Sequence, residues 1–215
     1  MLVFDVLGSL LDEDQGQRDA VARALDLPAE QAQEFVAVWS SRFDQLIQSI
    51  WRDGERYRTS EALHRQAVVE SADQLHLPLP DGVADELSRF GRTLEPFPDV
   101  QGALAELGRR HPLVALTNAG SAQAFAMSRH AGLRWSYLVS GEVVQAFEPD
   151  PRMYQYAITA LDQVPQDCIF VAAHPWDLAA AARHGFRTAL LDRAGTGGDF
   201  DFFATDLAAL VPLLE

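Results

Sequence analysis

Short apolar runs alternate with helix-like segments along much of this chain. Runs without polar alternation are typical of strands buried on both faces. We expect such strands at residues 2–6, 113–116, 137–139, 169–172 and 188–191. Helical periodicity separates the later runs, at residues 121–131, 151–161 and 176–184. This alternation predicts an α/β fold whose core is a parallel sheet of five or more strands joined by right-handed crossovers.

The pattern changes between the first and second predicted strands. Residues 15–94 carry helical periodicity and almost no strand signal, and proline-rich punctuation at 95–98 closes the block. We therefore expect an inserted helical cap at 15–94, and a core made of 1–14 and 95–215.

Composition limits the partners and the compartment. The 215 residues are 48% hydrophobic and carry a formal net charge of −14, with scattered arginines, so we expect a globular protein that binds neither nucleic acid nor membrane. Met1 leads directly into an apolar run, so we expect no signal peptide and a cytoplasmic protein. Cys168 lies in a predicted strand and is expected to be an inert core thiol.

All 17 basic residues are arginine, and the chain contains no lysine. A Schiff-base lysine, a lysine general base and a lysine-tipped phosphate loop are therefore excluded.

Polar side chains follow four of the predicted strands. They are Asp5, Thr117 with Asn118, the loop at Glu148, and the segment from His174 to Asp177. Ligands of open parallel sheets bind beyond the carboxyl ends of the strands, so the topology brings these groups to one candidate site. Individually, Asp5 could be a nucleophile, a metal ligand or a cap, and Thr117 and Asn118 could bind an anion or cap a helix.

Four segments in order carry a resemblance to a known family. They are Phe4-Asp5-Val6-Leu7-Gly8-Ser9-Leu10, Leu116-Thr117-Asn118, Phe147-Glu148-Pro149-Asp150-Pro151-Arg152-Met153-Tyr154, and Val171-Ala172-Ala173-His174-Pro175-Trp176-Asp177. Their order, spacing and cap position resemble the haloacid dehalogenase superfamily, most closely its L-2-haloacid dehalogenase branch, over essentially the whole chain. The resemblance implies a Rossmann-like core.

The resemblance also implies a reaction. The aspartate matching Asp5 would attack the substrate carbon, displace halide and form an ester that water then hydrolyses. Residues like Thr117 and Asn118 would hold the substrate carboxylate, and one like Asp177 would organise water and a lysine. No metal or other cofactor is implied for this branch, and the expected substrate is a small anionic organic acid.

Further residues are expected at the substrate site. Leu7, Gly8 and Ser9 follow the aspartate, and Gly8 permits a tight turn that brings backbone amides close to an anion. Trp39 and Trp176 are expected to line the cleft, although aromatic residues at such spacings also build ordinary cores.

The chain departs from the family pattern at the lysine position, which is Glu148. A like charge ~4 Å from Asp5 costs on the order of 4 kcal/mol at an effective dielectric of 20. An inward Glu148 would repel the Asp5 carboxylate, hinder its attack on the substrate carbon and favour a proton shared by the two carboxyls. An outward Glu148 would only leave Asp5 without a neighbouring cation. Arg152 could reach back to restore a positive charge, lie on the surface or pair with Glu148.

Two other positions depart from the pattern. Ser40 follows Trp39 where the branch places a halide-binding arginine, and Arg42 lies about 200° around a helix from the required direction. His174 stands where the better-known dehalogenases have asparagine, and either orients water or caps the next helix.

Three functions stay open at this point. The first is a 2-haloacid dehalogenase, weak or altered in substrate, and the second is a non-catalytic binding or regulatory protein on the same fold. The third is a magnesium-dependent phosphatase, which Leu7 and Ala173 oppose because they replace metal carboxylates. In that case Asp5, Glu148 and Asp177 would have to form an improvised cation site. A homodimer is an open alternative to a monomer.

Overall fold

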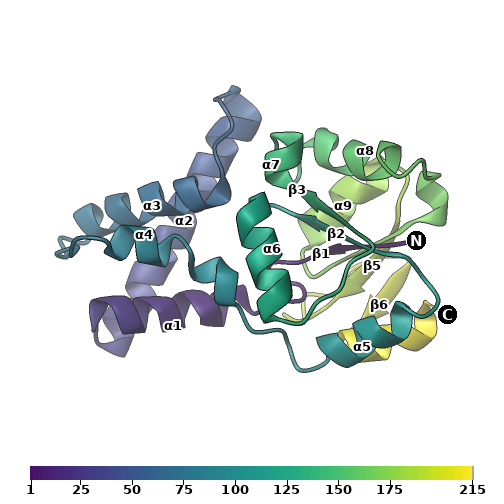
Figure 1. Cartoon of the computed structure of the whole chain (residues 1–215), viewed down its shortest axis with the longest axis horizontal. Coiled ribbons are helices and arrows are strands. Elements are labelled where there is room, and N and C mark those ends of the chain that lie inside the picture. The colour runs from purple at the N-terminus through teal and green to yellow at the C-terminus, as the bar shows by residue number, and fades with distance from the viewer. Residues whose placement is uncertain (215) are drawn as a thin grey trace.

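The core of the molecule is one parallel sheet of six strands in the order β3-β2-β1-β4-β5-β6 (Figure 1). The structure, a computed structural model, describes residues 1–214. The strands are β1 (Leu2–Asp5), β2 (Leu113–Thr117), β3 (Tyr137–Ser140), β4 (Ile169–Ala172), β5 (Arg187–Leu191) and β6 (Phe202–Ala204). The expected α/β fold and parallel sheet are confirmed.

Two hydrophobic layers cover the two faces of the sheet. Leu2 and Phe4 of β1 belong to one core cluster and Val3 to the other, because successive side chains of a strand point to opposite faces. This two-sided burial explains why the strands read as continuous apolar runs.

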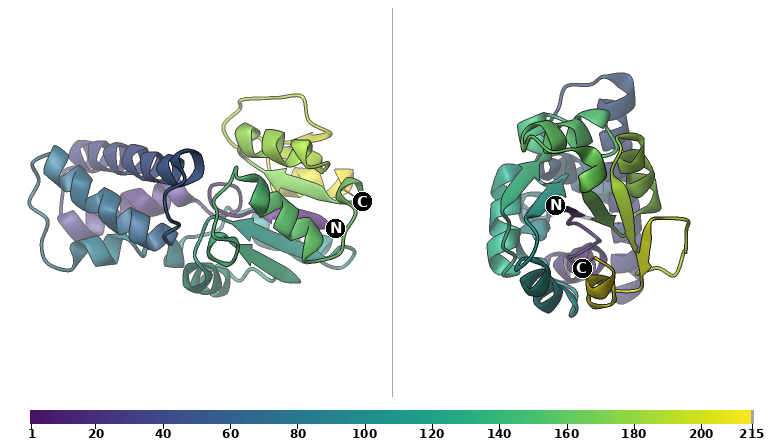
Figure 2. Two further views of the ribbon diagram at one scale, coloured as in Figure 1. Left: turned by 90° about the horizontal axis from the view of Figure 1, so that it is seen from above. Right: turned by 90° about the vertical axis from the view of Figure 1, so that its right-hand side faces the viewer.

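Helices supply the partners for both faces (Figure 2). The helices of this core are α5 (Val100–Leu107), α6 (Ser121–His130), α7 (Gly141–Val144), α8 (Pro151–Thr159), α9 (Pro175–Arg183) and α10 (Leu207–Leu210). Short 3-10 helices are η2 (Pro165–Asp167) and η3 (Val211–Leu213). Buried side chains of α5, α6 and α10 join the cluster that contains Phe4, whereas those of α8 and α9 join the cluster that contains Val3.

The part of the chain between β1 and α5 is helical and projects from one end of the sheet (Figures 1 and 2). Its elements are α1 (Glu13–Leu25), α2 (Ala29–Asp53), α3 (Ser60–Gln74), α4 (Val83–Leu87) and the 3-10 helix η1 (Phe90–Thr93). We call this segment the helical block. The division of the chain into domains at 15–94 stays a prediction, and α1 itself begins at Glu13.

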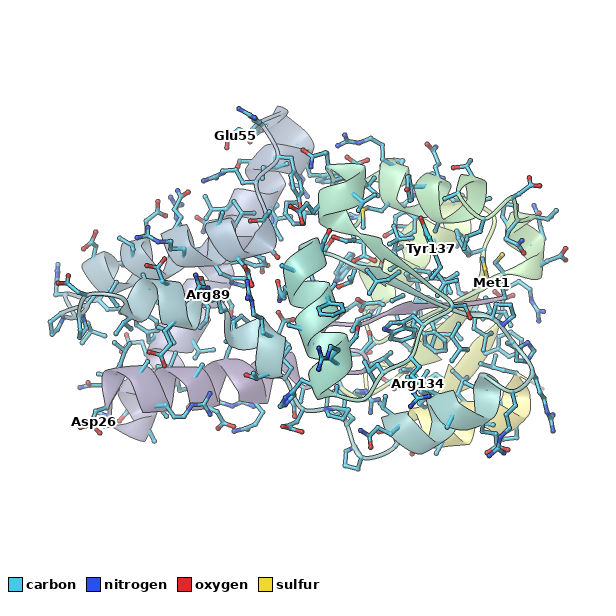
Figure 3. All side chains as sticks on the ribbon, viewed as in Figure 1. Met1, Asp26, Glu55, Arg89, Arg134 and Tyr137 are labelled. Atoms are coloured by element: carbon cyan, nitrogen blue, oxygen red, sulfur yellow. The ribbon has the colours of Figure 1, made fainter. Side chains whose placement is uncertain are left out.

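The strands run toward the helical block. Met1 and Tyr137, at the beginnings of β1 and β3, lie on the side of the sheet away from it (Figure 3). The carboxyl ends of the parallel strands therefore face the helices, which is where ligands of such sheets bind.

Local signals that set the helix ends are visible at α8. The Asp150 carboxylate accepts a hydrogen bond of 2.9 Å from the backbone N–H of Arg152, and Pro151 occupies the first turn. Among residues 1–214, no helix combines the length and apolar character needed to cross a membrane.

Candidate active site

A cavity of about 520 Å³ lies between the carboxyl edge of the sheet and the helical block. It is lined by Asp5, Leu7, Glu13, Phe43, Asp44, Ile47, Gln48, Trp51, Arg52, Ser60, His64, Asn118, Glu148, Pro149, His174 and Trp176. Both parts of the chain contribute, so the sheet supplies the floor and the helices supply the opposite wall.

Asp5 ends β1 and is held by the turn that follows it. The Ser9 hydroxyl donates a hydrogen bond of 2.6 Å to Asp5 Oδ2, and Ser9 Oγ accepts one of 2.7 Å from the backbone N–H of Ala173. Ser9 is fully buried. One hydroxyl thus fixes the direction of the Asp5 carboxylate against the end of β4.

Gly8 permits the close approach of His174 to this turn. Its φ is +74°, and a Cβ added at this position would lie 2.9 Å from His174 Nε2. His174 Nε2 lies 3.2 Å from the carbonyl oxygen of Leu7 and 3.7 Å from Asp5 Oδ2. The His174 side chain makes no capping hydrogen bond to α9, so this geometry favours a role toward Asp5 over the capping alternative.

Three carboxyl groups meet beneath the cavity. Asp5, Glu148 and Asp177 each place one oxygen atom within 4.8 Å of the other two. We call these residues the carboxylate triad. Glu148 points inward and is 4% exposed, and Asp177 is fully buried. Of the two orientations left open for Glu148 by the sequence, the inward one is found.

Arg152 does not compensate the triad. Its guanidinium makes a bidentate contact with Asp150, at 3.0 Å from Nε to Oδ1 and 2.7 Å from Nη2 to Oδ2, and its side chain is 55% exposed. Of the three alternatives for Arg152, the surface position is found, and the contacts with Asp5 and with Glu148 are not. Asp150 binds the guanidinium because it is the N-cap residue of α8 and Arg152 lies in the first turn of that helix.

Burial and like charge shift the acidity of the triad. Burial, and then Asp177 and Asp5, raise the pKa of Glu148 well above its usual range. Burial, and then the charge of Asp5, raise the pKa of Asp177 well above its usual range. Burial also raises the pKa of Asp5, but His174 and the Ser9 hydroxyl act in the opposite direction. Asp5 is thus the member whose ionised form is best supported.

Two oxygen atoms of the triad have no hydrogen-bond partner within the described chain. They are Glu148 Oε1 and Asp177 Oδ2, and both are inaccessible to solvent. The other oxygen of Asp177 accepts a hydrogen bond from the Tyr154 hydroxyl. Buried polar atoms of native proteins are nearly always paired, so these two atoms mark the triad as unusual.

The second predicted motif divides between two environments. Asn118 lines the cavity, and its Oδ1 accepts a hydrogen bond of 2.7 Å from the backbone N–H of Glu148. Thr117 is fully buried, and its hydroxyl oxygen accepts a bond of 3.2 Å from the N–H of Ala119. Thr117 is therefore part of the turn after β2 rather than of the cavity wall.

The two tryptophans also differ in their surroundings. Trp176 lines the cavity, is 49% exposed and stacks on His174 with ring centroids 5.5 Å apart. Trp39 is fully buried inside the helical block, with Phe90 5.1 Å away, and does not line the cavity. Its neighbour Ser40 donates a hydrogen bond of 3.0 Å to Gln17 Oε1.

The helical block contributes titratable side chains that sequence reasoning did not assign to the site. Glu13, Asp44 and His64 line the cavity, and Arg52 is the only arginine among the described residues that do so. The helical periodicity of 15–94 predicted the helices, but the face that meets the sheet depends on how the block docks. No local signal could have identified these residues.

Two of these side chains have strongly shifted acidity. Burial raises the pKa of Glu13 to about 7, with Asp5 adding to the effect and His174 opposing it. Burial lowers the pKa of His64 to about 3. His64 is stacked on Phe43 with ring centroids 3.6 Å apart, and its Nδ1 has no partner within residues 1–214. At neutral pH His64 is therefore an uncharged ring in the cavity wall.

Comparison with known proteins agrees with this arrangement. The family of haloacid dehalogenase-like hydrolases matches residues 1–185, which is most of the chain. The chain belongs to this family. The superfamily expected from the four motifs is thereby confirmed.

Two relatives of this family match along more than nine-tenths of their length. The (S)-2-haloacid dehalogenase of Pseudomonas sp. (strain YL) is 30% identical over 224 residues, covering 100% of this chain and 94% of that protein. The (S)-2-haloacid dehalogenase 4A of Burkholderia cepacia is 29% identical over 225 residues, covering 99% and 93%. These relatives support a haloacid dehalogenase-like hydrolase.

Solved structures of the family share the same architecture. The crystal structure of the L-2-haloacid dehalogenase PA0810 has a TM-score of 0.89 and 28% identity, and covers 100% of this chain and 98% of that chain. The crystal structure of the defluorinating L-2-haloacid dehalogenase Rha0230 has a TM-score of 0.89 and 25% identity, covering 99% and 94%. The match extends over the sheet and the helical block together.

Proposed function

We propose that this protein is a slow hydrolase of small 2-haloacids, with Asp5 as the nucleophile. The observation that carries the proposal is the setting of Asp5 at the floor of the cavity. Its carboxylate is aligned by the 2.6 Å bond from Ser9 and is the member of the triad whose ionised form is best supported. Relatives named (S)-2-haloacid dehalogenases support the substrate class.

The reaction would proceed in two steps. An oxygen of Asp5 attacks carbon 2 of the haloacid, the carbon–halogen bond breaks, and halide leaves with the bonding electrons to give an aspartyl ester. Water then attacks the ester carbonyl carbon of Asp5, releasing the 2-hydroxy acid and a proton and regenerating the carboxylate. His174 Nε2, 3.7 Å from Asp5 Oδ2, is positioned to orient that water.

Two side chains in the cavity are suited to hold the substrate carboxylate. Asn118 uses its Oδ1 for the N–H of Glu148, which turns its amide N–H groups to other partners. Arg52, near the end of α2, supplies a positive charge on the opposite wall. The proposal assigns binding to Asn118 and Arg52, and gives Thr117 the task of shaping the turn that presents Asn118.

Glu148 is the reason that we propose slow turnover. It occupies the position where the family resemblance implies a lysine, and it faces Asp5 from within the triad. A neutral carboxyl there gives Asp5 no cationic support, and an ionised one opposes the build-up of charge on the nucleophile. Asp177 adds a further carboxyl on the same side, so the triad offers an anionic substrate no positive charge.

Halide release tests the proposal directly. The purified chain is incubated with L-2-chloropropionate, and chloride is measured over hours beside an Asp5→Asn variant. We expect slow release from the wild type, none from Asp5→Asn, and an increase of at least about tenfold in Glu148→Lys, equivalent to about 1.4 kcal/mol of barrier. Wild-type release equal to that of Asp5→Asn would overturn the proposal.

A non-catalytic binding protein is the second candidate. The unpaired, buried Glu148 carboxyl beside Asp5 favours it, as does Ser40 engaged with Gln17 where the branch has a halide-binding arginine. Chloride release that remains absent in both the wild type and a folded Glu148→Lys variant would favour this function.

A further inference from the structure

Apolar side chains of the helical block face the same cavity as Asp5. Phe43, Ile47 and Trp51 of α2 all line it, opposite the carboxyl edge of the sheet. We propose, building on the proposed function, that this wall binds an apolar substituent on carbon 3 of the 2-haloacid. The substituent is about as large as a phenyl ring, so the preferred substrate is bulkier than 2-chloropropionate.

The three side chains form one stripe along α2, which we call the apolar stripe. They are spaced by four residues, so they lie about one turn apart on the same face of the helix. Leu46 and Ile50, on the adjoining face, are buried within the core. Phe43, Ile47 and Trp51 are only partly buried. The apolar stripe therefore presents apolar surface to the cavity itself.

The apolar stripe and the cavity are larger than a haloacid of three carbons requires. From Phe43 to Trp51 the helix rises about 12 Å, since each residue adds roughly 1.5 Å. The cavity has a volume of about 520 Å³, whereas an apolar cavity of about 150 Å³ is enough to hold a benzene ring. The cavity thus has room for a ring beside the carboxylate and carbon 2 of a bound substrate.

Other apolar and aromatic groups extend the wall beyond the apolar stripe. His64 stacks on Phe43 with ring centroids 3.6 Å apart and lines the cavity beside it. On the sheet side, Leu7 and the half-buried Trp176 line the cavity. A bound ring would therefore meet apolar surface from both parts of the chain, and aromatic rings make favourable edge and offset contacts with one another.

The charges of the cavity favour an apolar substituent over an acidic one. Glu13, Asp44 and Glu148 line the cavity, and Arg52 is the only arginine among the described residues that do so. In the proposed function, Arg52 and Asn118 bind the carboxylate that every 2-haloacid carries. A second carboxylate on the substrate would find no further cation in this wall, whereas an apolar group would find the apolar stripe.

Binding of 2-hydroxy acids to the wild-type protein tests the proposal without any turnover. Attack from behind carbon 2 inverts its configuration, so the products of L-2-haloacids are D-2-hydroxy acids. Calorimetric titration compares D-2-hydroxy-3-phenylpropionate, D-lactate and D-malate, which differ only in the group on carbon 2. We expect the phenyl ligand to bind at least about tenfold more tightly than D-lactate, because burial of a ring contributes a factor of this order. D-malate should bind no more tightly than D-lactate.

Matched variants locate the binding surface. Ile47→Ala shortens the middle of the apolar stripe and should reduce the preference for the phenyl ligand over D-lactate at least about threefold. Trp176→Ala, on the opposite side, should also reduce it and serves if Ile47→Ala does not fold. Val38→Ala removes a partly buried aliphatic side chain of the same helix outside this cavity and should leave the preference unchanged.

Several results would overturn the proposal. They are no binding of the phenyl ligand at millimolar concentration, equal affinities for the phenyl ligand and D-lactate, and tighter binding of D-malate than of the phenyl ligand. A preference that persists in folded Ile47→Ala and Trp176→Ala, or that Val38→Ala reduces equally, would place the ring elsewhere. None of these measurements depends on halide release, so failure of the dehalogenase proposal is separately recognisable.

Discussion

A single residue, Glu148, determines much of the character of this site. Its backbone N–H is fixed by Asn118, and its side chain is enclosed beside Asp5 and Asp177. The family resemblance implies a lysine at this position. The chain's general use of arginine in place of lysine does not explain Glu148, because an arginine would have kept the positive charge. Because Glu148 points inward, its carboxyl lies beside Asp5 and Asp177, and the site lacks the positive charge that a lysine would supply there.

Replacing Glu148 with glutamine should stabilise the folded protein. The pKa of Glu148 is higher in the folded than in the unfolded protein. The free energy of unfolding of the wild type therefore falls as pH rises from the unfolded toward the folded pKa. The neutral amide of glutamine avoids this loss. We expect a gain on the order of 1–3 kcal/mol at pH 8, and a smaller gain at pH 5. Urea unfolding at the two pH values measures it. The exposed Glu86→Gln is the control, and an equal gain at both pH values would contradict the explanation.

His64 should make the protein sensitive to acid. Its pKa is about 3 when folded and about 6.5 when exposed, so below pH 6.5 the unfolded chain takes up a proton that the folded chain refuses. Stability should therefore fall as pH decreases from 6.5 toward 3. His64→Phe removes this proton uptake and keeps a ring against Phe43. Relative to the wild type, the variant should gain roughly 2 kcal/mol between pH 7 and pH 5, measured by urea unfolding. A pH-independent difference would refute this role.

At the scale of elements, apolar runs predicted five strands, because two-sided burial leaves a clear signal. The sixth, β6, has three residues of mixed exposure after a glycine-rich loop, so its run is too short to recognise. The four-residue helix α7 is likewise shorter than the period needed to detect it. Strand order and register depend on contacts between distant segments, and the sequence predicted only that the strands are parallel.

The turn after β1 offers a test of whether Gly8 is needed for the close approach of His174. Gly8 and Gly54 both have positive φ, +74° and +75°, but an added Cβ meets His174 at Gly8 and nothing within 4 Å at Gly54. Gly54→Ala should cost about 1 kcal/mol through backbone strain alone. Gly8→Ala should cost about 1–3 kcal/mol and also displace His174. Urea unfolding titrations compare the two variants. Equal losses of unfolding free energy would show that the contact with His174 does not contribute to the cost of Gly8→Ala.

At the scale of the whole molecule, the cavity belongs to the sheet and the helical block together. The sequence predicted the groups at strand ends, because parallel topology alone brings Asp5, Asn118, Glu148 and His174 to one edge. It did not predict the wall opposite. Trp39 was expected there on the family pattern, but its apolar ring is enclosed by other helix side chains instead. Which helix face meets the sheet is a property of docking, which local periodicity does not encode.

Arg52 provides a test of whether the helical block contributes to substrate binding in the cavity. It is the only arginine among the described cavity-lining residues of a chain with net charge −14, so it should contribute most of the local attraction for an anion. In an Asp5→Asn background, which prevents turnover, Arg52→Ala should weaken binding of L-2-chloropropionate severalfold. The affinity of the Asp5→Asn parent should also fall more steeply with salt than that of the protein that carries Arg52→Ala as well. Arg56→Ala, outside the cavity wall, is the control, and equal effects of both substitutions in calorimetry would contradict the assignment.

The Ser9 hydroxyl joins two chain segments that are 164 positions apart, since it donates to Asp5 and accepts from the N–H of Ala173. The direction of the Asp5 carboxylate therefore depends on the end of β4 as well as on β1. An insertion or proline placed near Ala173 would redirect Asp5 without touching any residue of its own strand. Changes in the loop before α9 would thus act on the Asp5 carboxylate indirectly, through the Ser9 hydroxyl. Ser9→Ala would remove this hydroxyl and so uncouple Asp5 from the loop.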